Sequence, residues 1–175
     1  YKNGKKEGLE TTWWESGKKW TEIHYKDGKK DGLYTSWHSN GKKEEERHYK
    51  NGIDEGHWIS WWNNGQKKLE RHFKDGKFDG RWTEWHENGQ ISSEGYFKDF
   101  KQEGFWTFWY ENGEKQLEGH YKNGLADGLH VRWHENGSLK SQTHFKDGKK
   151  TSEKHFEDEE WSLTNIFSLL VGLFL

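Results

Sequence analysis

The sequence contains no cysteine, no proline and no methionine. The absence of cysteine excludes disulfides and thiolate metal sites, although it leaves the redox compartment open. Without proline, nothing prevents an apolar segment from pairing inside a β-sheet. The chain begins at Tyr1, so we expect the native start to lie upstream or to have been removed, with any signal peptide out of view. We expect a cytoplasmic location, with membrane association or export as alternatives.

Apolar residues are scarce as well. Only 29% of the 175 residues are hydrophobic and the mean hydropathy is -1.38, which is too little to fill a compact globular core. Aromatic residues nevertheless reach 17%, with 13 Trp, and this is the opposite of a disordered composition. The 28 Lys and Arg are interspersed with 30 Asp and Glu, so the chain lacks the basic footprint of a nucleic-acid binder. We expect an ordered fold built on aromatic residues.

An aromatic residue followed by lysine recurs every 24 residues. When each copy is numbered from 1 to 24, position 8 is glycine and position 13 is tryptophan in all six full copies. Position 4 is glycine in every copy except the fifth, where Phe100 stands. The pattern predicts a repeat region over residues 1–156, followed by a different segment over residues 157–175. The copies start at Tyr1, Tyr25, Tyr49, Phe73, Phe97, Tyr121 and, for a shortened seventh copy, Phe145.

Each copy carries two turn dipeptides, one near position 3 and an Asn-Gly near position 16. Both are signals for type I′ hairpins, and the segments between them are rich in Trp, Tyr, Phe and Thr. Two turns per copy predict two strands per copy. We therefore expect an all-β protein, an elongated single antiparallel meander of stacked hairpins with about 12 to 13 strands and a length of roughly 60 Å. Alternation places the position-13 tryptophans on one face and the position-1 aromatics on the other.

The register within a hairpin depends on the length of the second turn. If Asn40-Gly41 is a two-residue loop, Ser39 pairs with Lys42, Trp37 faces Glu44, and Gly32 falls opposite Tyr49. A three-residue loop with a bulge would shift these pairs by one. Both registers remain open at this point.

The repeat phrases resemble those of a known family. Tyr25-Lys26-Asp27-Gly28-Lys29-Lys30-Asp31-Gly32 and Trp85-His86-Glu87-Asn88-Gly89-Gln90 are similar to the MORN repeat variant of bacterial YwqK-type antitoxin proteins. The resemblance covers residues 1 to about 156. It implies an open antiparallel sheet without catalytic residues that contacts proteins or membranes. The antitoxin name implies a toxin as the protein partner.

Position 10 is the column that varies most among the aromatic positions. It reads Trp58, Trp82 and Trp106 in the three central copies but Glu10, Tyr34 and His130 in the outer ones. Alternation places position 14 on the same face, and an exposed aromatic patch of this kind usually marks an interface. Alternatively, the central copies are only the best-covered ones. The predicted partner-binding residues are Trp58, Trp82, Trp106, Trp62, His86 and Tyr110.

The invariant columns indicate structural roles. The position-13 tryptophans could form a ladder for glycans, but an unvarying column fits better as cover for a thin sheet. Histidines at position 24 recur roughly 9.6 Å apart, too far to share a metal ion, so we expect them to pack or to bond the position-7 acids. The acids of positions 7 and 22 are expected to pair with lysines of the Lys18 and Lys26 type. Such repetition argues against an active site, and we expect no enzyme activity, cofactor or metal.

The C-terminal segment has a different composition. An acidic run, Glu157 to Glu160, precedes the apolar segment Leu163–Leu175. As a helix this segment would extend roughly 20 Å, short of the ~30 Å hydrocarbon core of a membrane. We expect a helical cap for the sheet, with a membrane anchor or an oligomer contact as alternatives. The sequence therefore predicts a non-catalytic scaffold that binds a protein partner, or alternatively a membrane-associated or self-assembling structural protein.

Overall fold

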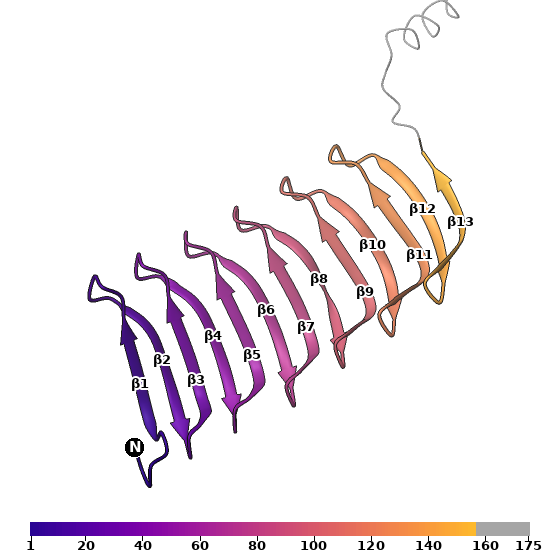
Figure 1. Ribbon diagram of the computed structural model, residues 1–175. Helices are drawn as coiled ribbons and strands as arrows, with labels where there is room; N and C mark the ends of the chain where they lie inside the picture. The colour runs from indigo at the N-terminus through magenta and orange to yellow at the C-terminus, as the bar shows by residue number, and fades with distance from the viewer. Residues whose placement is uncertain (157–175) are drawn as a thin grey trace, which may run out of the picture.

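The computed structural model describes residues 1–156, which form a single open sheet of 13 antiparallel strands. The strands lie in the sheet in sequence order, so each one pairs with the next along the chain. Figure 1 shows the hairpins side by side in one long row, with the strands bowed along their length. The expected all-β meander is confirmed. Its strands are β1 (Gly8–Trp13), β2 (Lys19–Lys26), β3 (Lys29–Trp37), β4 (Lys43–Lys50), β5 (Ile53–Trp61), β6 (Lys67–Lys74), β7 (Lys77–Trp85), β8 (Ile91–Lys98), β9 (Lys101–Trp109), β10 (Lys115–Lys122), β11 (Leu125–Trp133), β12 (Leu139–Lys146) and β13 (Lys149–His155).

The apolar segment Leu163–Leu175 lies outside the described residues. Its expected helical form, and its role as a cap, anchor or assembly contact, therefore stay predictions. Within residues 1–156, no helix is long and apolar enough to cross a membrane.

The first turn of each copy has the conformation that the sequence predicts. Asp27 and Gly28 both have positive φ, 50° and 82°, and the flanking residues Lys26 and Lys29 face each other. Two consecutive residues with positive φ define a type I′ hairpin, whose twist matches that of the strands. This turn therefore joins neighbouring strands directly, without an extra residue.

The second turn has three loop residues, so of the two alternatives the three-residue loop holds and the two-residue type I′ turn does not form there. Within this loop of the second copy, residues 39–41, only Gly41 has positive φ (93°), and its N–H donates to the carbonyl of His38 at 2.8 Å. The pair that closes the loop is His38 and Lys42, not Ser39 and Lys42. A glycine with positive φ at the third position of such a loop forms a bulge, in which two residues of one strand oppose one residue of the other.

A second irregularity changes the predicted pairing of the tryptophans. Trp37 faces Lys43 rather than Glu44, because the register shifts between Ser36 and Trp37. Farther from the turn, Gly32 faces Tyr49, as the two-residue loop predicts, because this second irregularity restores the pairing that the longer loop shifts by one. The same shift recurs in the other hairpins, so every copy keeps the same register relative to its neighbours.

The constant register lines up equivalent side chains in rows across the sheet. Positions 10 and 23 form one such row, and the face that carries it also carries the position-1 aromatics; we call this the aromatic face. Position 13 lies on the opposite face with the position-19 lysines, and we call this the lysine–tryptophan face. All buried hydrophobic residues belong to the aromatic face, which therefore holds what core the sheet has. They are Ile23, Leu69, Phe73 and Trp106.

Hydrogen bonds also join each copy to the next along the two turn edges. On one edge, the side-chain amide of Asn64 donates to the carbonyl of Glu87 at 2.7 Å, and the same bond recurs one copy further along from Asn88 to Glu111 at 2.6 Å. Each of these asparagines also accepts a backbone N–H within its own turn. The copies are therefore connected by side chains as well as by strand pairing.

The acid columns bind other partners than predicted. Most position-7 acids accept the backbone N–H of the next copy's first turn, as Glu55 does from Asp75 at 2.9 Å. A position-7 acid paired with a Lys26-type lysine occurs in Asp127, 3.3 Å from Lys146. The position-22 acids pair with position 19 instead of position 18. The position-7 acids thus bind the turn backbone on the same edge of the sheet. The position-22 acids pair with the lysines that cover the tryptophans.

The glycines at position 8 give a stability prediction. Gly80 has φ 137° and an added Cβ would lie 2.8 Å from Cβ of His72, whereas Gly56 has φ 78° with nothing within 4 Å. Gly56→Ala should lower the free energy of unfolding in urea by about 1–2 kcal/mol, the usual cost of a left-handed alanine. Gly80→Ala should lower the free energy of unfolding by about 3 kcal/mol or more, because the added Cβ clashes with Cβ of His72 in addition to straining the backbone. Equal losses for the two variants would contradict this packing.

Candidate functional site

The row at positions 10 and 23 has a distinct composition in the centre of the sheet. In β5 to β7 it alternates between tryptophan and arginine, as Arg71 faces both Trp58 and Trp82. In β8 and β10 the facing residue is glycine, and outside this central part the row contains no further tryptophan. From one end to the other it reads Glu10, Ile23, Tyr34, Arg47, Trp58, Arg71, Trp82, Gly95, Trp106, Gly119, His130, Thr143 and Glu153.

Rings from neighbouring strands pack on this central part of the row and make one continuous cluster over β5 to β9. Phe78 is its centre, with ring-centre distances of 4.6 Å to Phe73 and 5.5 Å to Trp82. Trp82 in turn lies 4.8 Å from Phe97, and Phe97 lies 5.0 Å from Trp106. Contacts of this kind favour tilted and edge-to-face rings and stabilise by about 0.5–1.5 kcal/mol each beyond area burial.

Two arginines lie within the cluster and differ in their partners. The guanidinium of Arg47 stacks 3.8 Å from the ring of Trp58 and also pairs with Glu45 at 2.5 Å. Arg71 lies between two indoles, 4.5 Å from Trp58 and 3.9 Å from Trp82, and its buried Nε has no hydrogen-bond partner among residues 1–156. Burial lowers the pKa of the Arg71 guanidinium to about 10, because the charged form loses hydration there.

The predicted contact residue Trp106 is not available to a partner. It is 2% exposed, and its indole covers the bare backbone of Gly95 so closely that an added Cβ would lie 2.2 Å from the ring. Its Nε1 donates to the carbonyl of Tyr96 at 3.2 Å. Trp58 and Trp82 are half-buried; Arg71 faces both of them, and Gly95 lies on the other side of Trp82.

The three predicted residues at position 14 connect copies at the edge of the aromatic face. Trp62 donates from Nε1 to the carbonyl of Trp85, and His86 and Tyr110 make the equivalent bond one and two copies further on. Their polar atoms are therefore engaged. Only their ring surfaces remain for a partner, as a rim beside the central cluster.

Phe100 is a contact candidate that the sequence prediction missed. It has φ 66° in a turn where the other copies have glycine, and left-handed backbone is unfavourable for a bulky side chain. Its ring packs edge-on against Phe78 at 5.1 Å and yet is 50% exposed. The signal was the one aromatic in the glycine column of position 4. Strain of this kind persists where the side chain has a use, so Phe100 belongs with the candidate site.

The opposite face offers no free ladder of tryptophans. The lysine at position 19 covers the tryptophan of the next copy in four of the copies, for example Lys67 at 5.4 Å from the ring of Trp85. The same lysine pairs with Glu70 at 2.7 Å. This arrangement fits the expected structural role of the column and leaves the aromatic face as the candidate site.

The repeats match a known family along most of their length. The MORN repeat variant matches residues 6–27, 30–51, 54–75, 78–99, 102–123 and 126–147. The chain belongs to the MORN repeat variant family. No curated protein matches the chain.

Each complete MORN match corresponds to one hairpin of the sheet. Residues 30–51, for example, contain β3, the three-residue loop and β4. The protein is thus a MORN repeat scaffold, and proteins of this family are generally non-enzymatic. MORN repeats often mediate contacts with proteins or membranes.

The two arginines in the ring cluster of this MORN sheet give a matched pair of variants. Arg71→Met should change the free energy of unfolding by less than about 1 kcal/mol, because the lost cation–π contacts are offset by removal of a charge that lacks a hydrogen-bonded partner. Arg47→Met should cost about 1–2 kcal/mol, since it leaves Glu45 unpaired at a partly exposed site. Urea unfolding measures both. A larger loss for Arg71→Met than for Arg47→Met would show that the assignment of partners is wrong.

Proposed function

We propose that this MORN protein is a non-catalytic scaffold that binds a protein partner through the centre of its aromatic face. The observation that supports this most is the continuous ring cluster over β5 to β9, where half-buried tryptophans, an unpaired guanidinium and a strained, exposed phenylalanine lie together. Tryptophan and arginine are the residues that most often dominate the energetics of protein interfaces.

The proposed contact surface consists of a centre and a rim. Trp58, Trp82 and Phe100 present exposed ring surface at the centre, and Arg71 adds a cation between the first two. Trp106 packs against Trp82 and Phe97 and supports the cluster without being exposed itself. The rim is made by the position-14 residues Trp62, His86 and Tyr110, whose ring faces close the patch toward the loop edge.

A double variant tests this surface. Trp58→Ala combined with Phe100→Gly should weaken partner binding at least about tenfold, because it removes two exposed rings from the centre. Phe100→Gly restores the residue of the other copies and relieves positive-φ strain, so the fold is retained. The measurement is the retention of proteins from a native extract on immobilised wild-type and variant chains, with circular dichroism to verify folding.

The matched control is Trp13→Ala, which removes a tryptophan that is 59% exposed on the lysine–tryptophan face. The expected result is a protein retained by the wild type and by this control but lost from the double variant. Equal retention by the double variant and the control would reject the proposed surface.

The YwqK-type resemblance makes a toxin the partner to test first. We propose that the captured protein arrests bacterial growth when it is produced alone and that co-production of this chain relieves the arrest. The Trp58→Ala/Phe100→Gly variant should fail to relieve it. Normal growth with the captured protein alone would exclude the antitoxin role while leaving the binding surface intact.

A further inference from the structure

The lysine–tryptophan face departs from the repeat in the third and fourth copies. Position 9 is leucine in the first, second and sixth copies but histidine at His57 and arginine at Arg81. His57 therefore directly faces His72, the position-24 histidine of the same copy. Within residues 1–156, no other two histidines face each other in the strand register. The roughly 9.6 Å spacing within the position-24 column does not limit this pair, because the two histidines lie on adjacent strands.

We propose that His57 and His72 together bind one divalent transition-metal ion of the class that prefers imidazole, such as Cu²⁺, Ni²⁺ or Zn²⁺. The two ring centres lie 5.2 Å apart. Two imidazoles that share one ion through bonds of ~2.0–2.1 Å at a tetrahedral angle have ring centres roughly 5 Å apart. The strand pairing thus already sets the separation that a shared ion needs.

Hydrogen bonding prepares one of the two rings as a ligand. Nδ1–H of His72 donates to the backbone carbonyl of Asp79 at 2.9 Å, which leaves Nε2 with its lone pair. Metal-bound histidines are usually oriented by such a bond from the second ring nitrogen. His57 makes no hydrogen bond within residues 1–156, and its side chain is 65% exposed. The present edge-on arrangement of the rings, at 88°, therefore changes to a chelating one by rotation of the free imidazole of His57.

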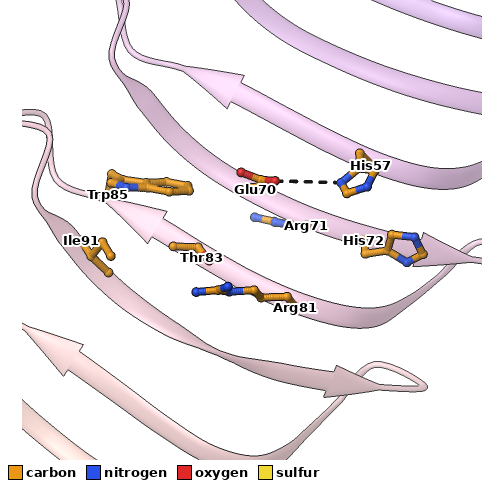
Figure 2. A pocket seen from close by; sticks show the side chains of 8 residues that line it. All are labelled: His57, Glu70, Arg71, His72, Arg81, Thr83, Trp85 and Ile91. Carbon is orange, nitrogen blue, oxygen red and sulfur yellow. Dashed lines mark ion pairs between the residues drawn. The ribbon is translucent and has the colours of Figure 1, made fainter.

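The surroundings of the pair suit a cation. His57 and His72 both line a hollow of about 380 Å³, whose wall also includes Glu70 and Thr83. Figure 2 shows the side chains of these four residues. Oε1 of Glu70 lies 4.0 Å from Nδ1 of His57, while its other oxygen pairs with Lys67. The nearby guanidinium of Arg81 is paired with Glu94 at 3.1 Å. Lys67 and Arg81 are thus each paired with a carboxylate, and Oε1 of Glu70 is left on the side of His57.

The site is built from two protein ligands. No group of three His, Cys, Asp or Glu side chains within residues 1–156 is arranged to hold an ion. The remaining coordination positions are therefore open to water or to a side chain of another molecule. This function is independent of the aromatic face, which lies on the other side of the sheet.

The test is calorimetric titration of the full chain with ZnCl₂, together with electron paramagnetic resonance after addition of CuCl₂. The wild type should bind one ion per chain at this site, with two nitrogen ligands in the copper spectrum. His57→Leu installs the residue of the first, second and sixth copies, so the sheet should fold unchanged. It should weaken binding at least about tenfold, because one of two ligands is lost.

Two controls complete the experiment. His48→Ala removes a position-24 histidine that faces Leu33, and it should leave the affinity within about twofold. Leu33→His places a second histidine pair opposite His48 and should add a second site. Unchanged affinity in His57→Leu, or a copper spectrum with a single nitrogen ligand in the wild type, would overturn the proposal.

Discussion

Within residues 1–156 the sheet is a single layer, so its side chains must cover one another across the strands. On the aromatic face, rings pack against rings, arginines or bare glycine backbone of the facing strand. On the other face, lysine stems and ammonium groups cover tryptophans, and glutamates neutralise the lysines. Both arrangements need facing residues to be of complementary type, which only a constant register provides. The 24-residue period is the consequence of that requirement.

The same constraint distinguishes the columns that hold the sheet together from the residues of the candidate sites. Columns that vary little, such as the position-13 tryptophans and the position-16 asparagines, hold neighbouring copies together. Copies three to five depart from the consensus on both faces, with the ring cluster on one side and the facing histidines on the other. These departures cost local regularity, as the left-handed Phe100 shows. They are concentrated at the centre of the sheet, where neighbours on both sides hold the backbone in place.

The sequence was sufficient for the period, the strand order and the first turn, because these follow from local signals repeated six times. It was insufficient for the second turn, since Asn-Gly fits both a two-residue loop and a three-residue loop with a bulge. The full burial of Trp106 depends on its position over Gly95 and opposite Gly119, whereas Trp82 has Arg71 on one side, so it required the register. The pairing of His57 with His72 was hidden for the same reason, since it joins two different columns.

The most direct test of the constant register is a set of distances between equivalent turns. The chain has no cysteine, so spin labels can be attached to pairs of cysteines introduced in exposed loops. Double electron–electron resonance between labels at Glu87 and Glu135, two copies apart, should give roughly 19 Å, and labels at Ser39 and Glu135 should give roughly 38 Å. Distances that fail to grow with the number of intervening copies would contradict a continuous sheet of hairpins in register.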